Sequence, residues 1–390
     1  MPASPRPAVT ALLLVAGVVC SAWMVWATVS SGHYDDFDVL HDAAVAWHSG
    51  RSIYDSHIPD PVPGYPAANL NPPHLTLLMA PLGRLTLRQA AAVSWLGIAL
   101  AILGCGLVWS RLMPSGWAWR ALALVLLTGG SMYAIRLVNT GWPLALAVSL
   151  AWLSLRRGRA SLAGLIIGCC AATKVFLFLF LPYWVWHRNW RAVAGCIGGA
   201  FMVFSAGLLV EGPVGYVRWQ HLLGGVTWGW MGANATLTGM LARTLSITPA
   251  PSPFAPLAVA PPLLLTALWG LGALGVAGLF FRRFHAAKDL DAEWAAVLLG
   301  ATLLSPMAWC YYWPMAVGPL AATYARRGAP IWLACLLLVG AVVPFTVFLA
   351  PGFTPLGTAT AGNAYFWATL AAFAVATRLG QLPSESMLRE

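Results

Sequence analysis

Apolar stretches long enough to cross a lipid bilayer recur along almost the whole of this chain. The first of them, residues 8–30, contains no charged side chain, and a helix of about 20 apolar residues spans the hydrocarbon layer. Charged residues make up 9% of the 390 residues and hydrophobic ones 59%, whereas about 25% of the residues of a soluble domain are charged. The sequence therefore excludes a water-soluble globular fold and predicts an all-α polytopic membrane protein.

Twelve apolar segments are the predicted spanning helices of a single integral membrane domain, residues 1–390. The first segment is too long for the apolar core of a signal peptide and lacks a clear cleavage site, so we expect it to stay. Three middle segments are too short to cross about 30 Å of hydrocarbon. Either their limits differ or they end beside a water-filled cavity. The twelve segments are residues 8–30, 89–110, 119–135, 142–155, 160–173, 175–186, 192–210, 259–281, 293–309, 311–325, 330–350 and 363–378.

The distribution of basic residues predicts the orientation. With the N-terminus in the cytoplasm, most of the 22 Lys and Arg side chains fall in cytoplasmic connections, in agreement with the positive-inside rule. We predict a plasma (inner) membrane protein with both termini cytoplasmic and with two long outer loops, residues 31–88 and 211–258. Because the net charge of +10 follows from this bias, membrane lipids are the expected partners and nucleic acid is not.

The first outer loop, residues 31–88, holds much of the polar chemistry of the chain. A loop of this length in a compact protein is usually functional or disordered. Within it, residues 39–47 carry apolar side chains at helical spacing, which predicts a short amphipathic helix along the membrane surface. Half of the 12 Asp and Glu residues lie in this loop: Asp35, Asp36, Asp38, Asp42, Asp55 and Asp60.

Basic residues near the predicted outer face are candidates to bind an anionic substrate. The chain has no phosphate-binding Gly-x-x-x-x-Gly-Lys-Ser/Thr loop, so an enzyme of this sequence would use no soluble nucleotide donor. A lipid-linked substrate would instead place its phosphate at the headgroup level, where it needs basic partners. Arg136 and Lys174 lie at predicted outer ends of spans, and Arg243 lies in the second loop. The alternative is that these side chains extend to the lipid headgroups.

Three aspartates directly after the first predicted helix are candidates for acid–base chemistry. An inverting glycosyl transfer needs one general base that takes the proton of the acceptor hydroxyl, and Asp35, Asp36 and Asp38 each offer a carboxylate. Two alternatives remain open. Carboxylates at a helix N-terminus stabilise its dipole, and together with His33 and His41 they could ligate a divalent metal. The spacing is not diagnostic of a metal site, and none is assigned.

Five short motifs occur in the same order as in a known family of membrane enzymes. An Asp-Phe motif opens the first outer loop and an Asn-Pro-Pro motif closes it. A Gly-containing segment that ends in lysine, an Asn-x-x-Leu-x-Gly motif and a Leu-Ser-Pro-x-x-Trp motif follow. These motifs are Asp36–Val39, Asn71–Pro73, Gly164–Lys174, Asn234–Gly239 and Leu304–Trp309. In them the chain resembles glycosyltransferase family 87 over nearly its whole length.

The resemblance implies a fold and a reaction. The fold is that of the GT-C class, and the reaction is an inverting transfer, on the outer face, from a polyprenyl-phosphate sugar donor to a lipid-linked or cell-envelope glycan acceptor. Known members include mannosyltransferases and an arabinofuranosyltransferase, and we expect mannose and no cofactor. The Asp of the Asp-Phe motif is the base in this family, which corresponds to Asp36, with Asp35 and Asp38 as secondary candidates. Tyr311 and Tyr312 stand where many members have two histidines, which puts a histidine role there in doubt.

The predicted site consists of residues implied by the resemblance and of the basic residues near the outer face. Lys174, Arg136 and Arg243 are expected to hold and neutralise the donor phosphate, and Asn71, His74, Asn234 and Tyr312 to line the pocket. Two other functions remain open, a transporter or flippase of lipid-linked sugars and a non-catalytic scaffold. A transporter predicts inverted repeats and charges near the middle of the membrane, but the sequence has no convincing repeat and nearly every charge maps to a helix end. A scaffold leaves the acidic loop unexplained.

Overall fold

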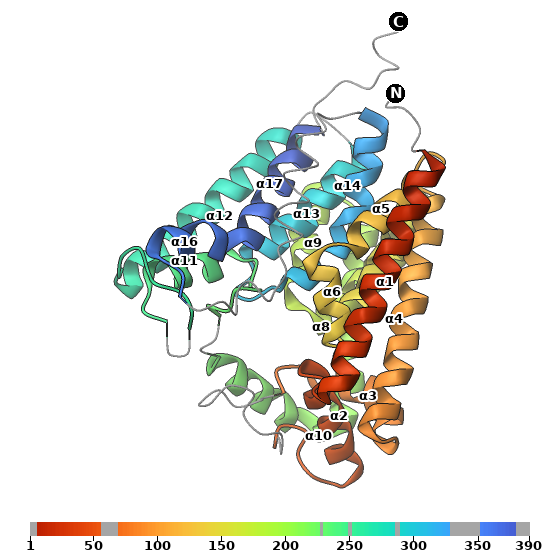
Figure 1. Ribbon diagram of the computed structural model, residues 1–390, viewed down its shortest axis with the longest axis vertical. Coiled ribbons are helices and arrows are strands. Elements are labelled where there is room, and N and C mark those ends of the chain that lie inside the picture. Colours follow the sequence, from red (N-terminus) through yellow and green to blue (C-terminus); the bar gives the residue numbers. More distant parts are fainter. Residues whose placement is uncertain are drawn as a thin grey trace, which may run out of the picture. The chain divides into compact units, whose positions relative to one another are not determined.

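The chain folds into helices that form two compact units. The structure is a computed structural model that describes residues 6–55, 69–226, 229–248, 252–284, 289–327 and 352–379. Over these ranges the secondary structure is helical apart from two isolated β-bridges (Figure 1), which confirms the predicted all-α class. Unit 1 comprises Met1–Cys20, Cys105–Tyr133 and Gly229–Glu390, and unit 2 comprises Ser21–Gly104 and Ala134–Trp228.

Unit 2 contains the described part of the acidic loop, which folds into three short helices. The helix that precedes the loop begins in unit 1, and the one that follows it ends there. The predicted amphipathic helix is confirmed as α2, whose apolar side chains, among them Phe37 and Leu40, are buried. In order, the elements are α1 (Pro7–Ser31), α2 (Asp36–His48), α3 (Pro73–Met79), the 3-10 helix η1 (Ala80–Arg84) and α4 (Leu87–Ser110).

The rest of unit 2 is a helical bundle held by close glycine contacts. Its elements are α7 (Gly141–Arg156), α8 (Ala160–Thr173), the 3-10 helix η2 (Val175–Leu179), α9 (Phe180–Trp186) and α10 (Trp190–Gly224). A Cβ added at Gly164 or Gly168 of α8 would lie 2.0–2.1 Å from a carbonyl oxygen of α10, and one at Gly195 or Gly199 of α10 would lie 2.2 Å from a carbonyl oxygen of α8. Small residues four apart let two helix backbones approach this closely. The contact fixes the end of α8, which Lys174 follows.

The contact between α8 and α10 leads to a stability prediction. Because the Cβ of Gly168→Ala would overlap the carbonyl oxygen of Cys196 at 2.0 Å, the helices must separate, and we expect a loss of about 1–3 kcal/mol in the free energy of unfolding. Gly198→Ala on α10 is the matched control, since a Cβ there meets nothing within 4 Å and alanine favours a helix. Thermal unfolding in detergent should separate the two variants. Equal melting temperatures would contradict the packing described here.

A kink divides α10 into two parts. Glu211 (φ −134°, ψ 18°) and Gly212 (φ 59°, ψ −158°) leave the helical conformation and Pro213 follows them. Proline supplies no backbone N–H, and the positive φ of Gly212 is one that glycine adopts without strain. The predicted span 192–210 corresponds to the first part. The second part lies within the predicted outer loop 211–258, which is helical up to Gly224, and α10 packs against α3.

Unit 1 is built around α13, which is buried along its length. Its core residues from Asp291 to Leu303 are all buried, and α14 and α17 pack against it. A helix that is apolar on all sides needs such a surrounding. The elements of this unit are α5 (Trp117–Leu126), most of α6 (Gly129–Arg136), α11 (Leu237–Leu245), α12 (Pro262–Phe284), α13 (Leu290–Leu304), η3 (Cys310–Tyr312), α14 (Pro314–Arg327), α16 (Pro355–Ala359), η5 (Ala361–Asn363) and α17 (Ala364–Leu379).

Among the described residues, α1, α4, α10 and α12 are long and apolar enough to cross a membrane. The predicted straight span 119–135 is instead the pair α5 and α6, bent by 67°, and the predicted span 175–186 begins as the 3-10 helix η2. Five further predicted spans correspond to α7, α8, α13, α14 and α17, which have 14 to 16 residues. Segment 330–350 lies outside the described residues, and the total of twelve spans stays a prediction.

Candidate active site

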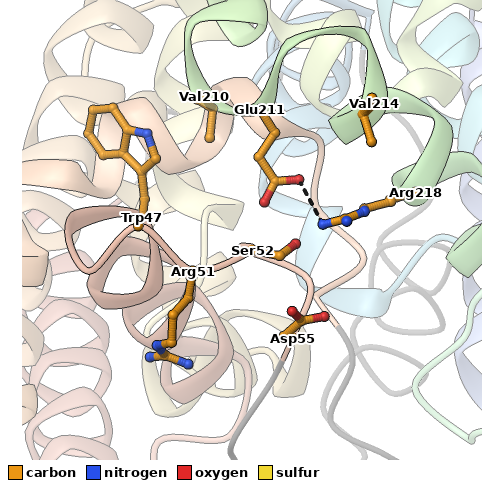
Figure 2. Close-up of a pocket in the computed structure, with 9 residues that line it drawn as sticks. Trp47, Arg51, Ser52, Asp55, Val210, Glu211, Val214 and Arg218 are labelled. Atoms are coloured by element: carbon orange, nitrogen blue, oxygen red, sulfur yellow. Dashed lines mark ion pairs between the residues drawn. The ribbon is translucent and has the colours of Figure 1, made fainter.

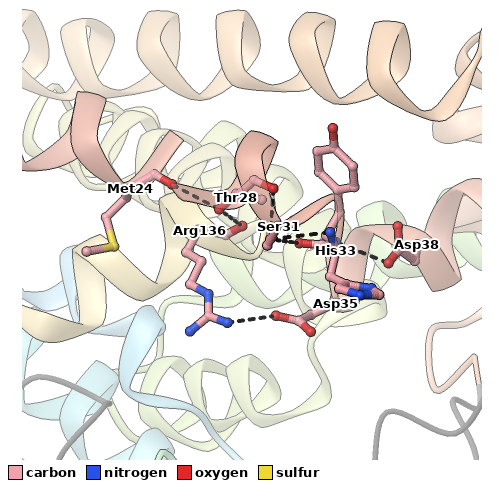
Figure 3. A network of polar contacts seen from close by, with 8 residues as sticks. Met24, Thr28, Ser31, His33, Asp35, Asp38 and Arg136 are labelled. Atoms are coloured by element: carbon pink, nitrogen blue, oxygen red, sulfur yellow. Dashed lines mark hydrogen bonds and ion pairs between the residues drawn. The ribbon is translucent and has the colours of Figure 1, made fainter. Parts of the chain in front are cut away.

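Asp35 and Arg136 form an ion pair where α1 is connected to α2. Asp35 precedes α2 directly and has a positive φ of 48°, a conformation that costs energy in a residue other than glycine. Its Oδ2 lies 3.7 Å from Nη2 of Arg136, the last residue of α6 (Figure 3). The carbonyl oxygen of Arg136 accepts a hydrogen bond from the Thr28 hydroxyl of α1 at 3.3 Å. These contacts hold a carboxylate and a guanidinium together in unit 2.

The surroundings of Asp35 and Asp38 change their acidity in the same direction. Burial raises the pKa of the Asp35 carboxyl, and the nearby Arg136 and His33 counteract this only in part. Burial also raises the pKa of Asp38, while the backbone N–H of Tyr34 lowers it. A raised pKa makes a carboxylate a stronger base at neutral pH, so Asp35 and Asp38 are suited to accept a proton.

The three candidate aspartates differ in what holds their side chains. Asp38 Oδ2 accepts the backbone N–H of Tyr34 at 3.1 Å, which ties the first turn of α2 to the segment before it. Asp35 is paired with Arg136. Asp36, the first residue of α2, is exposed. Asp36 and Asp38 both lie in the first turn of α2, where a carboxylate stabilises the helix dipole, so this alternative applies to both residues, and their chemical role stays a prediction.

Lys174 and Asn71, from distant parts of the sequence, meet in unit 2. Lys174 follows α8, whose C-terminal dipole favours a cation, and its Nζ donates to Oδ1 of Asn71 at 3.3 Å. Asn71 is held by Asn69, whose Oδ1 accepts its backbone N–H at 3.1 Å, and by the Tyr54 hydroxyl, which donates to its carbonyl at 3.2 Å. The Asn-Pro-Pro motif and the lysine motif thus come together in the fold.

His74 lies one helical turn further on and connects α3 to α8 and α10. The Tyr216 hydroxyl donates to the Phe204 carbonyl at 2.7 Å, so its oxygen accepts from Nδ1 of His74 at 3.3 Å. Nε2 is then the acceptor for the Thr173 hydroxyl at 3.4 Å, which assigns the neutral Nδ1–H tautomer. Burial lowers the pKa of His74 to about 4, so His74 is neutral at physiological pH.

The neutral state of His74 predicts how stability depends on pH. Since its pKa is lowered from 6.5 to about 4, the unfolded chain binds the proton first, and stability falls as the pH drops from 6.5 to 4. The loss from this residue is about 3 kcal/mol at pH 4. We expect His74→Gln, which does not titrate, to show a smaller drop in melting temperature between pH 7 and pH 4.5 than the unmodified protein. An equal drop would exclude a buried neutral His74.

The Asn234–Gly239 motif has a structural explanation in unit 1. Oδ1 of Asn234 accepts the backbone N–H groups of Thr236 and Ala308, both at 3.3 Å. The Thr236 hydroxyl caps α11 by accepting the N–H of Gly239 at 2.9 Å, and a Cβ at Gly239 would lie 2.8 Å from Cγ of Asn234. The motif therefore joins α11 to the Leu304–Trp309 segment, as the β-bridge between Asn234 and Trp309 also indicates.

Arg243, a predicted phosphate ligand, uses its guanidinium inside unit 1. It is fully buried, and its Nε donates to Oδ1 of Asn363 at 2.8 Å. Nη1 donates to the carbonyls of Trp230 and Met231 at 3.2 and 2.7 Å, and Nη2 donates to the carbonyl of Asn234 at 3.0 Å. These four hydrogen bonds connect the segment before α11 to η5, so Arg243 stabilises the fold of unit 1.

The predicted site residues thus form two groups in unit 2 and one in unit 1. Unit 2 holds the group of Asp35, Asp36, Asp38 and Arg136 and the group of Asn71, His74 and Lys174. Asn234, Arg243 and Tyr312 belong to unit 1, where their exposed fractions are 0%, 0% and 3%. The side chains of Asn234 and Tyr312 are packed in the interior, and the expectation that they line the pocket stays a prediction.

Thr173 and Tyr216 are polar residues of the site that the sequence did not single out. Thr173 directly precedes Lys174, which is the one signal for it, whereas Tyr216 is distant in sequence from His74. Within the described ranges, no three His, Cys, Asp or Glu side chains are arranged to hold a metal ion. His41, considered above as a possible ligand, has its Nε2 3.0 Å from the Leu85 carbonyl.

Comparison with known proteins agrees with the motifs. The chain is 28% identical over 399 residues to a protein of Mycolicibacterium smegmatis, described as a polyprenol-phosphate-mannose-dependent alpha-(1-2)-phosphatidylinositol pentamannoside mannosyltransferase; the alignment covers 95% of this chain and 92% of that protein. No solved structure matches the chain significantly. Residues 69–309 match glycosyltransferase family 87, a range that contains Asn71, Lys174 and the two motifs of unit 1. Since this range is more than half of the sequence, the chain belongs to glycosyltransferase family 87.

Proposed function

We propose that this membrane glycosyltransferase transfers mannose from a polyprenyl-phosphate mannose donor to a lipid-anchored mannoside. One observation carries the proposal: within a single unit, the loop after α1 places acids beside Arg136 at one end and Asn71 beside Lys174 at the other. An acid and a phosphate-binding cation are the two groups that this transfer requires. Family membership supports an enzyme rather than a transporter or a scaffold, and the name of the mycobacterial relative supports mannose as the sugar.

In the proposed reaction, Asp36 takes the proton from the acceptor hydroxyl. The hydroxyl oxygen then bonds to the anomeric carbon of mannose on the face opposite the phosphate, and the bond between that carbon and the phosphate oxygen breaks. The electron pair leaves with the polyprenyl phosphate, so the configuration inverts. We assign the base to Asp36 because it is the Asp of the Asp-Phe motif, the position that the resemblance to glycosyltransferase family 87 implies for the base.

Lys174 and Arg136 would bind and neutralise the departing phosphate in this mechanism. Both are cations of unit 2, and each is oriented by a neighbour, Lys174 by Asn71 and Arg136 by Asp35. Preoriented charges at the position where negative charge develops lower the barrier most. Asn71 and His74 position this group. Arg243 is not included, because its donors already bind Asn363 and three carbonyls.

The relative's name and the distribution of basic residues support the acceptor and the side of the membrane. The relative is named for a phosphatidylinositol pentamannoside acceptor, and we extend to this chain an acceptor of that class, a phosphatidylinositol mannoside. We place the reaction at the outer face of the plasma membrane, with both termini cytoplasmic. The bias of basic residues supports this orientation, since it assigns residues 31–88, and with them the acids, to the outer side.

The proposal is tested with the purified protein in lipid nanodiscs. Radiolabelled polyprenyl-phosphate mannose and a phosphatidylinositol mannoside are supplied, and the expected products are an elongated mannolipid and free polyprenyl phosphate in equal amounts. The nucleotide sugar GDP-mannose is the control donor and should give no product. Absence of transfer from the polyprenyl donor, or transfer from the nucleotide donor alone, would exclude the proposed function.

A further inference from the structure

A polar cavity of unit 2 lies apart from the groups assigned to the reaction. Its volume is about 560 Å³, within the range of small-molecule sites. Figure 2 shows Trp47 at one side, Arg51, Ser52 and Asp55 from the segment after α2, and Glu211 and Arg218 from α10. All of these lining residues, which lie in the described part of the chain, belong to unit 2.

Glu211 is held in this cavity by the kink of α10. The backbone leaves the helix at Glu211 and Gly212, and Oε1 of Glu211 accepts the backbone N–H of Ile53 at 2.6 Å. Oε2 lies 3.7 Å from Nη1 of Arg218. This second oxygen is buried and accepts no hydrogen bond, although buried polar atoms nearly always have such a partner. A ligand hydroxyl would supply one.

The two arginines of the cavity also have N–H groups that a ligand could accept from. Arg51 pairs with Asp42 at 3.8 Å through Nη2, while its Nη1 is buried and has no hydrogen-bond partner. Arg218 lines the cavity and its side chain is 50% exposed, and its guanidinium carries five N–H donors. The cavity therefore combines an acceptor and two donors whose bonding capacity is not used within the protein.

The balance of charge identifies the class of ligand. Two guanidinium groups face two carboxylates, those of Asp55 and Glu211, so an anion gains little from the site and is repelled by the buried carboxylate. A neutral ligand with many hydroxyl groups can both accept from arginine and donate to carboxylate. Trp47 adds a flat apolar surface of the kind that packs on a ring. These features suit a sugar ring.

We propose that this cavity binds a non-reacting sugar ring of the acceptor glycan, an inference that rests on the proposed function. Trp47 stands 11 residues after Asp36 on the same helix, which separates them by about 16 Å at 1.5 Å per residue. That distance exceeds the extent of one sugar ring. The site thus selects an oligosaccharide whose distal rings occupy the cavity while its terminal hydroxyl meets the base.

The test measures the KM for a phosphatidylinositol tetramannoside acceptor and the KM for the donor separately. Arg218→Met and Glu211→Gln are the test variants; the glutamine keeps the oxygen that accepts from Ile53. We expect each to raise the acceptor KM about tenfold, since one hydrogen bond to a charged group contributes about that factor. The donor KM and the kcat at saturating acceptor should not change, as for a purely binding contact. Arg88→Met, which removes an exposed arginine at the start of α4, is the matched control.

The direction of change in Glu211→Gln separates a sugar from a phosphate in the cavity. Loss of the negative charge weakens binding of a hydroxyl donor but strengthens binding of an anion. A lower acceptor KM in this variant would therefore overturn the proposal in favour of an anionic group, and an unchanged KM in both variants would show that the acceptor does not enter the cavity. If the unmodified protein transfers no mannose, the proposed function fails instead, and the two failures are distinct.

Discussion

Replacement of Asp36 by asparagine is expected to reduce mannosyl transfer by about 10²–10⁴-fold, the usual contribution of a general base. Asparagine has nearly the same shape but does not accept a proton at neutral pH, so the acceptor hydroxyl would remain a poor nucleophile. Because Asp36 is exposed at the first position of α2, the protein should fold normally. The KM for the polyprenyl-phosphate mannose donor should change little, since the phosphate is assigned to other residues.

Asp35→Asn is the companion variant that separates two adjacent acids. It removes the partner of Arg136 at 3.7 Å but leaves the assigned base, so we expect a smaller loss of kcat together with a raised donor KM. If Asp35→Asn abolishes transfer while Asp36→Asn retains it, the roles of the two residues are reversed. If neither variant loses activity, the base is not in this segment.

The positions of most helices could be predicted from the sequence because apolar runs end at charged or glycine-containing segments. The predicted segment 160–173 has the limits of α8. Two differences have local causes. Gly212 and Pro213 predict a helix end, and the backbone does leave the helical conformation at Glu211 and Gly212, but a second helical part follows at once and continues to Gly224. The bend between α5 and α6 falls at residues 128–131, where two adjacent glycines are a local signal for a break inside the predicted segment 119–135.

The predicted site residues differ in how much of their role the sequence could indicate. A motif indicates that a residue type is needed, but it does not say whether the need is chemical or structural. Asn234 appears in a family motif and Arg243 was singled out as a cation of the second loop, and both hold α11 and its neighbours. Lys174 was singled out as a cation at a helix end, but its contact with Asn71, 103 residues away, depends on the packing of α3 against α10 and of α10 against α8. Such contacts between distant residues arise only in the folded chain.

Replacement of Lys174 by methionine is expected to lower kcat/KM for the donor by about 10²–10³-fold, a loss typical for one group that stabilises developing charge. Methionine keeps an unbranched apolar side chain, so packing after α8 should persist while the positive charge is lost. Lys174→Arg keeps the charge and should recover part of the activity, less than all of it because the guanidinium is planar and larger than an ammonium group.

Asn71 provides the decisive control, because its Oδ1 accepts from Nζ of Lys174 at 3.3 Å. If Asn71 acts by holding that ammonium group, Asn71→Ala should weaken donor use in the unmodified protein but have little further effect once Lys174 is methionine. Residues that act through one another give such non-additive effects, whereas independent ones add. Donor kinetics of both single variants and the double variant measure the coupling. Fully additive losses would mean that the asparagine contributes on its own, and an unchanged donor KM and kcat in Lys174→Met would remove the lysine from the phosphate site.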